Sequence, residues 1–318
     1  MKQLAASLRG RELNHKFLYE SHKQTQRWLA LHAAFAPSRT DADCAAIYDQ
    51  AFSACADLLP RKSIHLVGLG CGGGQKDSRL LELLGTRDKC YTPVDVSVGL
   101  VLAARQKALE WISEESCRPL VCDLGAEDLG EILQSDTPSG ANRVVTFFGM
   151  VPNFEPAETT SLLNRLLRPG DYLLFSANLS PGASYSAGVR HVLPLYDNEP
   201  TRDWLMTFLY DLGCDRGDGD LNFEIEAGPH PERFERIVAV YTFQKNQELV
   251  VNDEAFKFLQ GDALRLFFSY RHTPALIRSW LGGGGLQLLG EWVAPSGEEG
   301  VYLFHRRGEK APLGAPCL

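Results

Sequence analysis

The segment from Ser63 to Ser97 constrains the fold of this chain more than any other stretch. It begins with a short apolar run, Ile64–Val67, which has the length of a buried strand and is closed by glycine. Five glycines follow between Gly68 and Gly74, and leucines then recur at helical spacing as far as Leu84. A second strand is expected at Tyr91–Val96. The segment therefore predicts a strand, a glycine-rich turn, a helix and a second strand, in that order.

An acidic residue stands near the C-terminal end of the second predicted strand. Asp95 lies 25 residues after Gly70, which is roughly the spacing at which nucleotide-binding folds place an acid against ribose hydroxyls. Glycines let the backbone pass close to a ligand, and the start of a helix offers free N–H groups. Together these features predict a site for a cofactor that carries a ribose.

Three interpretations of the glycine-rich turn remain open at this point. Gly68, Gly70 and Gly73 satisfy the G-x-G-x-x-G pattern of dinucleotide sites. The same kind of turn also packs on the methionine moiety of S-adenosylmethionine (SAM). The third interpretation is a glycine-rich turn that binds no ligand. The elements that follow the turn distinguish between the first two.

Strands and helices continue to alternate after Ser97. Strands are expected at 118–122, 143–148 and 171–177. Repeated βα units predict an α/β protein with a parallel sheet. The last two strands, at 286–293 and 301–306, are joined by Pro-Ser-Gly-Glu-Glu-Gly and form a hairpin. A dinucleotide dehydrogenase usually continues with a sixth parallel strand, so this order resembles the Rossmann-like sheet of class I SAM-dependent methyltransferases, which is parallel with an antiparallel terminal hairpin.

An insertion interrupts the alternation between residues 179 and 276. A helix is expected at 203–212, antiparallel strands at 236–243 and 247–251 with Lys245 and Asn246 at their turn, and a further strand at 263–270. An insertion of this length can form an inserted α+β lobe. The expected units are a SAM-binding domain of residues 61–178 and 277–308, a substrate lobe of residues 179–276 joined by the helical segment 1–60, and a tail at 309–318.

Composition narrows the classes of partner. The chain has 318 residues, of which 44% are hydrophobic and 23% charged, and a net charge of −8, as expected for an ordinary soluble globule. It has no long basic run and its apolar runs are too short to cross a bilayer, so neither nucleic acid nor a membrane is expected as a partner. The N-terminus lacks the apolar core of a signal peptide, which favours a cytoplasmic location. The eight cysteines include no C-x-x-C pair, so no metal is expected.

Several motifs occur along the chain in order. They are Lys16-Phe-Leu-Tyr19, Ala36-Pro-Ser-Arg39, Gly70-Cys71-Gly72 with Lys76, Pro93-Val-Asp-Val-Ser97, Asp123, F-F-G-M-V-P-N-F-E-P at 147–156 and L-R-P-G-D-Y-L-L at 167–174. This combination resembles the histidine-specific Nα-methyltransferase family, which includes the enzyme that makes trimethylhistidine for ergothioneine. The resemblance spans most of the chain and is weakest across the insertion.

The resemblance, together with the glycine motif, implies a set of residues that bind SAM, with S-adenosylhomocysteine as the product. The set comprises Gly68, Gly70, Gly72 and Lys76 at the methionine end, Asp95 at the ribose, Asp123 and Leu124 beside the adenine, and Tyr19 closing over the cofactor. A carboxylate can accept two ribose hydroxyls, and a lysine can pair with the cofactor carboxylate. From the residues by themselves, Lys76 would be a solvated helix lysine.

The resemblance also implies how a substrate is held. In the family, an asparagine of the G-x-x-x-N segment binds the main-chain groups of the amino acid, and Asn153 is its match. An amide both donates and accepts, so it can orient a neutral amine whose lone pair stays free to attack. A family tyrosine binds the carboxylate, and Tyr196 is the nearest match. The alternatives are an Asx turn at Asn153 and a core position for Tyr196. No dedicated catalytic residue is identified.

Two departures from the family pattern bear on the substrate. Phe35 stands where the family has a tyrosine. The family recognises imidazole with a glutamate and a serine in an E-x-S-x-K pattern, whereas this chain keeps Ser269 and has Phe267 in place of the glutamate. A buried carboxylate could accept the imidazole N–H, while phenylalanine offers only apolar surface. Histidine is therefore disfavoured as a substrate, unless Glu224 or Glu226 supplies the acceptor.

The chain is thus expected to be a SAM-dependent methyltransferase that acts on the nitrogen of an amino acid or of a small apolar or aromatic amine. Two alternatives remain open. One is an O- or C-methyltransferase of secondary metabolism on the same scaffold. The other is a SAM-binding protein without catalysis. The oligomeric state is left open.

Overall fold

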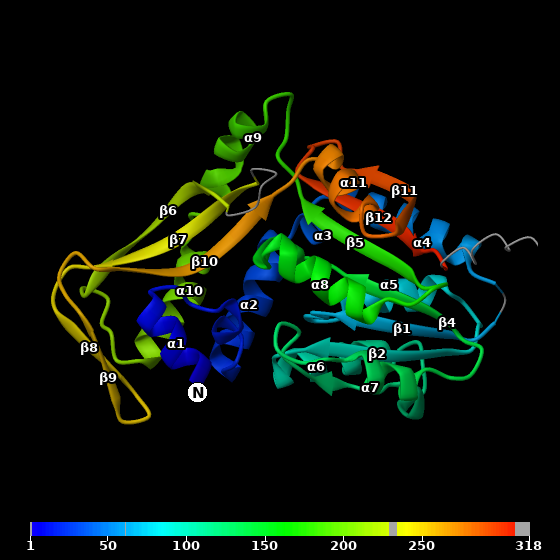
Figure 1. The fold of residues 1–318 in the computed structure, drawn as a ribbon, viewed down its shortest axis with the longest axis horizontal. Coiled ribbons are helices and arrows are strands. Elements are labelled where there is room, and N and C mark those ends of the chain that lie inside the picture. Colours follow the sequence, from blue (N-terminus) through cyan, green and yellow to red (C-terminus); the bar gives the residue numbers. More distant parts are fainter. Residues whose placement is uncertain (1, 61, 229–233, 309–318) are drawn as a thin grey trace, which may run out of the picture.

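The computed structural model describes residues 2–60, 62–228 and 234–308, so the tail expected at 309–318 lies outside the described residues. The larger part of the protein, at the right of Figure 1, is built on seven strands. They are β1 (Ile64–Leu69), β2 (Lys89–Asp95), β3 (Leu120–Val121), β4 (Asn142–Phe147), β5 (Tyr172–Asn178), β11 (Leu286–Val293) and β12 (Glu299–Arg306).

The seven strands lie in the order β11-β12-β5-β4-β1-β2-β3. Strands β1 to β5 pair in parallel, and β12 pairs antiparallel with both β5 and β11. The expected mostly parallel sheet with an antiparallel terminal hairpin is therefore confirmed. The strand order reverses at β1, which lies between β2 and β4, and open α/β sheets bind ligands at the carboxyl ends of the strands at such a point.

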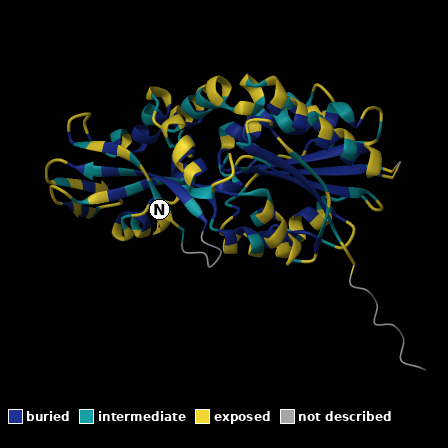
Figure 2. Ribbon diagram, turned by 90° about the horizontal axis from the view of Figure 1, so that it is seen from above, coloured by how far each residue is buried: buried dark blue, intermediate teal, exposed yellow. Residues whose placement is uncertain are grey.

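Helices cover both faces of this sheet. They are α4 (Ala42–Leu58), α5 (Gln75–Leu83), α6 (Val98–Ala108), α7 (Gly130–Asp136), α8 (Pro156–Leu166) and α11 (Pro274–Gly282), with the short 3₁₀ helices η2 (Glu114–Ser116) and η3 (Val151–Asn153) between them. Successive residues of a strand point to opposite faces, so each face carries its own apolar core. Figure 2 shows the result, with the strands of the sheet buried and the outer faces of the helices exposed.

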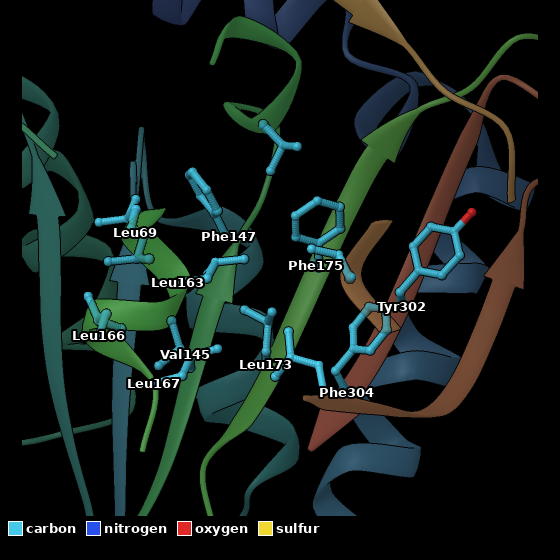
Figure 3. Close-up of a cluster of buried hydrophobic side chains, with 14 of the residues drawn as sticks. Leu69, Val145, Phe147, Leu163, Leu166, Leu167, Leu173, Phe175, Tyr302 and Phe304 are labelled. Atoms are coloured by element: carbon cyan, nitrogen blue, oxygen red, sulfur yellow. The ribbon is translucent and has the colours of Figure 1, made fainter. Parts of the chain in front are cut away.

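One core joins the sheet to α8 and α11. Figure 3 shows part of it, namely Leu69, Val145, Phe147, Leu163, Leu166, Leu167, Leu173, Phe175, Tyr302 and Phe304. The opposite core joins the alternate strand residues Leu66, Val144 and Leu174 to α4 and α5. The near-continuous apolar strands follow from this double coverage, because a parallel sheet is buried on both faces.

The smaller part of the protein, at the left of Figure 1, combines the N-terminal segment with the insertion. Its helices are α1 (Lys2–Gly10), η1 (His15–Leu18), α2 (His22–Phe35), α3 (Pro37–Thr40), α9 (Tyr185–Val192), η4 (Leu193–Leu195) and α10 (Glu199–Asp211). Its strands are β6 (Gly219–Ala227), β7 (Glu235–Phe243), β8 (Gln247–Val251), β9 (Glu254–Phe258) and β10 (Ala263–Arg271).

The pairing within the insertion differs from the expected hairpin at residues 236–251. Strand β7 lies between β6 and β10 in a three-stranded antiparallel sheet, and β8 pairs with β9 in a separate hairpin. Two residues with positive φ, Asn252 and Asp253, form the tight turn of that hairpin, and such turns favour this residue type. The sequence analysis did not identify β6, whose polar residues alternate along an edge strand.

The N-terminal segment divides between the two parts of the protein. Leu4 and Leu8 of α1 share a core with α10 and with β10, where Leu205 and Leu264 are fully buried. Helix α4 packs instead on the large sheet, with Phe52 in the core that contains β1. The segment 1–60, expected as a unit of the substrate lobe, therefore contributes its first helices to the lobe and α4 to the sheet.

A buried ion pair ties β4 to the start of β5. The guanidinium of Arg143 donates to the Asp171 carboxylate from Nε at 2.9 Å and to the Leu166 carbonyl at 2.6 Å, and both charged side chains are buried. Replacing Arg143 by methionine leaves the Asp171 carboxylate buried without its counter-charge. We therefore expect Arg143→Met to lower the free energy of unfolding by about 3–5 kcal/mol, as measured by urea denaturation.

A half-exposed arginine provides the matched control for this prediction. Arg278 pairs with Glu291 at 2.8 Å on the surface, so Arg278→Met should change the free energy of unfolding by no more than about 1 kcal/mol. Equal losses in the two variants would contradict the importance of the buried pair.

Candidate functional site

A cavity of about 330 Å³ lies where the carboxyl ends of the central strands meet the smaller lobe. Ligand sites of α/β proteins commonly lie at this edge of the sheet. The larger part contributes Gly70, Gly72, Lys76, Asp95, Asn153 and Asn178 to its lining. The smaller part contributes Tyr19, Trp28, Phe35, Tyr196, Trp204, Phe267, Ser269 and Arg271.

The glycine-rich turn after β1 forms the floor of the cavity. Gly70 and Gly72 have φ values of +57° and +52°, a conformation that glycine adopts without strain. A Cβ atom at Gly70 would overlap Sδ of Met150, and one at Gly72 would lie 2.8 Å from the Trp28 ring. Both positions therefore require glycine. Gly68, which was expected among the ligand-binding residues, lies within β1 and does not line the cavity, and a Cβ atom there would overlap the buried Asp77 carboxylate.

Asp95 closes one side of this turn from the end of β2. Its Oδ2 accepts the N–H of Gly72 at 3.1 Å and its Oδ1 accepts the N–H of Ser97 at 3.0 Å. The side chain is 3% exposed and faces the cavity. Each carboxylate oxygen retains a free lone-pair direction, so Asp95 can still accept hydroxyl groups from a ligand.

Lys76 lies near the start of α5 and is not a solvated helix lysine. Its ammonium donates to the Tyr48 hydroxyl at 2.6 Å and lies 3.6 Å from Oε1 of Glu299. It also sits 4.1 Å from the centre of the Tyr48 ring. The Glu299 carboxylate therefore compensates part of the Lys76 charge at the edge of the cavity.

Asp123 and Leu124, expected beside the adenine, have other contacts in the structure. The Asp123 carboxylate accepts the Lys16 ammonium at 2.8 Å, and the Leu124 side chain packs into the core beneath the sheet. Next to this ion pair, the ring of His15 packs edge-on against Phe154 at 4.7 Å. Burial lowers the pKa of His15 to about 4. None of these residues is among those that line the cavity, so the structure does not bring Asp123 and Leu124 into its wall.

Tyr19 follows η1 and faces the cavity from the same segment. Its ring lies 5.5 Å from that of Trp204 and 5.9 Å from that of Trp28. Burial raises the pKa of its hydroxyl, and the nearby Asp95 carboxylate raises it further. Tyr19 is therefore a neutral aromatic wall of the site at physiological pH.

Polar side chains gather at the lobe side of the cavity. Asn153 on η3 donates from Nδ2 to the carbonyl of Phe268 at 2.6 Å, so its amide reaches across to β10 instead of closing an Asx turn. The hydroxyls of Tyr196 and Ser269 lie 2.9 Å apart, and Arg271 donates to the Tyr196 hydroxyl at 2.8 Å. These groups offer both donors and acceptors to a bound molecule.

An aromatic wall adjoins these polar groups. Phe267 packs edge-on against Trp204 at 5.8 Å and lies 6.3 Å from Tyr196. Phe35, at the end of α2, lines the cavity at its rim and is 50% exposed. The wall therefore presents apolar, aromatic surface to the inside of the cavity.

The sequence analysis did not select several residues that line the cavity. They include Trp28, Met150, Asn178, Trp204 and Arg271. For Arg271 a sequence pattern was present, because residues 267, 269 and 271 alternate along β10 and therefore share one face of the strand. The other four residues come from separate elements, and only the tertiary structure brings them together.

Two kinds of feature are missing from the described residues. Within 2–60, 62–228 and 234–308, no group of three histidine, cysteine, aspartate or glutamate side chains is arranged to hold a metal ion. None of the helices in these ranges has the length and apolar character that crossing a membrane requires.

Comparisons with known proteins add a family to this geometry. The family described as "Histidine-specific methyltransferase, SAM-dependent" matches residues 2–306. The comparison with curated proteins finds no match. Among solved structures, the CcbJ methyltransferase from Streptomyces caelestis is 12% identical, with 82% of this chain and 90% of that chain covered and a TM-score of 0.42.

Two further solved structures hold ligands. Magnesium protoporphyrin IX methyltransferase (ChlM) from Synechocystis, with bound S-adenosylhomocysteine, is 13% identical, covers 90% of this chain and 94% of its own, and has a TM-score of 0.46. The 1,6-didemethyltoxoflavin-N1-methyltransferase of Burkholderia thailandensis, with bound 1,6-didemethyltoxoflavin and S-adenosylhomocysteine, is 12% identical, covers 90% and 89%, and has a TM-score of 0.43. These likenesses are distant, whereas the family match spans nearly the whole chain.

The titration of Asp95 tests the geometry of the site. Burial raises the pKa of its carboxyl to about 6, and the N–H groups of Ser97 and Gly72 limit this rise. We expect its carboxyl carbon to titrate near pH 6 in a ¹³C NMR experiment, with Asp95→Asn identifying the resonance. A midpoint near 4 would contradict a buried carboxyl.

The raised pKa of Asp95 also makes the free energy of unfolding depend on pH. The folded state binds the Asp95 proton more tightly than the unfolded chain, in which an aspartate titrates near 3.8. The contribution of this group to the free energy of unfolding therefore decreases as the pH rises from about 4 to about 6.

Proposed function

Because the chain belongs to the family of histidine-specific, SAM-dependent methyltransferases, we propose that it methylates the nitrogen of an amino acid, or of a small apolar or aromatic amine, other than histidine. The observation that carries the proposal is the shared cavity, in which the glycine-rich turn and Asp95 face Asn153 and Phe267. A cofactor half and a substrate half thus lie in one enclosure.

The residues of the first half fit SAM. The glycine-rich turn leaves space that side chains at Gly70 and Gly72 would fill, and the Asp95 carboxylate faces that space with lone pairs free for the ribose hydroxyls. Lys76 supports the methionine carboxylate, and its contact with Glu299 leaves further N–H donors available. Tyr19 closes the site from the N-terminal segment.

SAM supplies an electrophilic methyl group on a sulfonium, and the chain supplies orientation and a dry environment for its transfer. Asn153 accepts a hydrogen bond from the substrate amine through Oδ1, while its Nδ2 is held by the Phe268 carbonyl. This contact orients a neutral amine and leaves its lone pair free. The rings of Trp28, Trp204 and Phe267 exclude water from the same space.

The exclusion of histidine rests on the position of Phe267. This residue lies beside Ser269 in the cavity and presents an apolar ring where an imidazole N–H would need an acceptor. The two glutamates considered as substitutes are placed elsewhere. Glu224 is exposed, and Glu226 is held by Arg236 at 2.6 Å and by Arg265 at 2.8 Å.

We also propose that one part of the protein binds the substrate and the other binds SAM. Residues 179–276, together with the N-terminal segment through α3, form the substrate lobe. The sheet, with residues 61–178 and 277–308, forms the SAM-binding domain, on which α4 packs. The lobe covers the carboxyl edge of the sheet, where substrate is shielded from water.

Removing the Asp95 carboxylate tests the cofactor half of the site. Asp95→Ala deletes two buried, charge-assisted hydrogen bonds to the ribose, so we expect it to weaken SAM binding by roughly 2–4 kcal/mol. Isothermal titration calorimetry with SAM measures the change. Asp49→Ala, which removes a surface carboxylate paired with Arg79, serves as the control and should bind SAM as the wild type does. Unchanged affinity in Asp95→Ala would refute the placement of the cofactor.

The substrate half is tested by exchanging Phe267. Histidine bound to the wild type would bury a ring N–H without an acceptor, at a cost of roughly 1–3 kcal/mol, or about a ten- to hundredfold loss in binding. We expect histidine to be a poor acceptor of the methyl group and Phe267→Glu to improve its use relative to an aromatic amine. A panel of amino acids and amines, with the methylated products identified by mass spectrometry, measures this.

The same panel distinguishes the outcomes that oppose the proposal. Efficient methylation of histidine by the wild type would show that another group accepts the imidazole N–H. Products that carry the methyl group on oxygen or carbon would show that the enzyme does not methylate nitrogen. SAM binding without turnover of any compound would favour a non-catalytic role.

A further inference from the structure

The orientation of the Asn153 amide is set by a contact with the lobe. Its Nδ2 donates to the main-chain carbonyl of Phe268 on β10 at 2.6 Å, and the side chain is buried. The two ends of a side-chain amide differ, because the nitrogen only donates and the oxygen only accepts. A main-chain carbonyl therefore fixes which end it binds, and Oδ1 is the end that stays free for a bound molecule.

The carboxylate of Glu155, two residues after Asn153, binds the side of β10 that faces away from the cavity. Oε1 accepts a hydrogen bond from Nη1 of Arg236 at 2.6 Å, and Oε2 accepts one from the Tyr270 hydroxyl at 2.6 Å. Arg236 is on β7, where it lies opposite Tyr270 in the strand pairing. Glu155 thus uses both carboxylate oxygens to join the chain after η3 to two neighbouring strands of the lobe.

The contacts of Glu155 are made where water is largely excluded. Tyr270 is fully buried, and Arg236 is nearly so. Burial raises the pKa of the Tyr270 hydroxyl, and the Glu155 carboxylate raises it further, so the hydroxyl remains a donor at physiological pH. Hydrogen bonds to a charged group are stronger than neutral ones, and breaking one here leaves a buried group unpaired. The position of Glu155 is therefore firmly defined.

A β-bulge gives the same face of β10 a second arginine. The pairing of β10 with β7 shifts between Arg265 and Phe267, so the alternation of side chains changes by one position there. The Arg265 guanidinium consequently lies 5.7 Å from the centre of the Phe268 ring, and that of Arg236 lies 4.8 Å from it. Both arginines bind Glu226, at 2.8 and 2.6 Å. The residue that holds the amide is therefore itself held by two paired arginines.

These charged groups act on the cavity only from a distance. Glu155, Arg236 and Tyr270 do not line it, whereas Asn153 does. Phe154, between Asn153 and Glu155, is buried in the core beneath the sheet. Three consecutive side chains are thus fixed at three places, namely the cavity, the core and the lobe. An effect of Glu155 on a bound molecule therefore passes through its neighbours in the chain.

We infer that Glu155 is a positioning residue for methyl transfer. Its bonds to Tyr270 and Arg236 hold η3 against β10. Asn153 then keeps Nδ2 on the Phe268 carbonyl and Oδ1 toward the methyl acceptor. This inference rests on the proposed function, because it explains what orients the amide that would hold the amine. A misplacement of about 1 Å in an orienting group can lower a rate about a hundredfold, even when its cause lies outside the site.

Hydrogen exchange of the Asn153 side-chain amide measures this orientation without any substrate. In ¹H–¹⁵N NMR spectra of the protein, Asn153→Ala identifies the resonances by their loss. We expect Glu155→Ala to accelerate the exchange of this amide about tenfold or more, because its bond to the Phe268 carbonyl then opens more often. Gln24 is the internal reference. Its Nε2 donates to the buried Phe17 carbonyl at 2.8 Å, and its exchange should not change.

Three further variants separate positioning from a general loss of stability. Tyr270→Phe removes only the hydroxyl that binds Glu155 and should accelerate the exchange of Asn153 about threefold; it decides the question if Glu155→Ala does not fold. Glu155→Gln keeps the shape of the side chain and one acceptor, so it should restore part of the protection. Glu291→Ala removes a carboxylate of similar exposure that pairs with Arg278, and should leave the exchange of Asn153 unchanged.

Turnover provides a second measurement, with the compound of the amino-acid and amine panel that the wild type methylates fastest. Glu155→Ala should lower kcat/KM for that compound about 10- to 100-fold and leave the affinity for SAM within about twofold. In an Asn153→Ala background, the same substitution should lower kcat/KM by less than about threefold, because the amide that Glu155 positions is then absent.

The outcomes separate this inference from the proposed function. Unchanged exchange of the Asn153 amide in Glu155→Ala, or in Tyr270→Phe where Glu155→Ala does not fold, overturns the inference. Faster exchange of Asn153 and Gln24 alike overturns it too, as does an equal loss of kcat/KM with and without the Asn153 amide. A wild type that methylates no compound of the panel refutes the proposed transfer, whereas faster exchange confined to Asn153 still supports its positioning by Glu155.

Discussion

The hydrogen bonds of the Asp95 carboxylate hold the site together. They connect the end of β2 to the glycine-rich turn through Gly72 and to the start of α6 through Ser97. The hydroxyl of Ser97 lies 2.9 Å from that of Thr25 on α2, and Thr25 donates to the Tyr19 carbonyl at 3.1 Å. A continuous chain of hydrogen bonds thus runs from the floor of the cavity to its N-terminal cover. Burial of such a network makes each member costly to leave unpaired.

Strand β10 connects the same site to the substrate lobe. Residues 267, 269 and 271 face the cavity, whereas Phe268 and Tyr270 point to the opposite side, where the Arg236 guanidinium lies 4.8 Å from the centre of the Phe268 ring. The Tyr270 hydroxyl donates to Glu155 at 2.6 Å, two residues after the cavity residue Asn153. One strand therefore anchors the lobe on one face and lines the cavity on the other, because its side chains alternate.

Buried charged side chains among the described residues differ in whether the chain itself supplies their counter-charge. Arg143 and Arg236 are satisfied by carboxylates within the chain, as a buried charge requires for stability. Arg271 and the carboxyl of Asp95 face the cavity, and burial raises the pKa of the latter to about 6. Binding sites commonly carry such unfavourable local arrangements, which the rest of the fold stabilises.

The amino-acid sequence determined the local elements of this protein and part of its site. The strand, glycine-rich turn, helix and acid between Ser63 and Ser97 follow from periodicity and from glycine conformation, which act between near neighbours. The terminal hairpin and the alternation along β10 follow from the same kind of pattern. The expected residues Gly70, Asp95 and Asn153 meet in one cavity because parallel strands end at the same edge of a sheet.

Only the tertiary structure decided which distant groups meet. It paired β7 with β6 and β10. It also brought the Asp123 carboxylate into an ion pair with the Lys16 ammonium, and it placed α4 on the sheet. Above all, it left Arg271 buried among neutral oxygens. Long-range pairing depends on the summed burial of many side chains, which no local pattern contains. The sequence therefore determined which residues could form a site, and the packing of the lobe on the sheet decided which of them carry a charge without a partner.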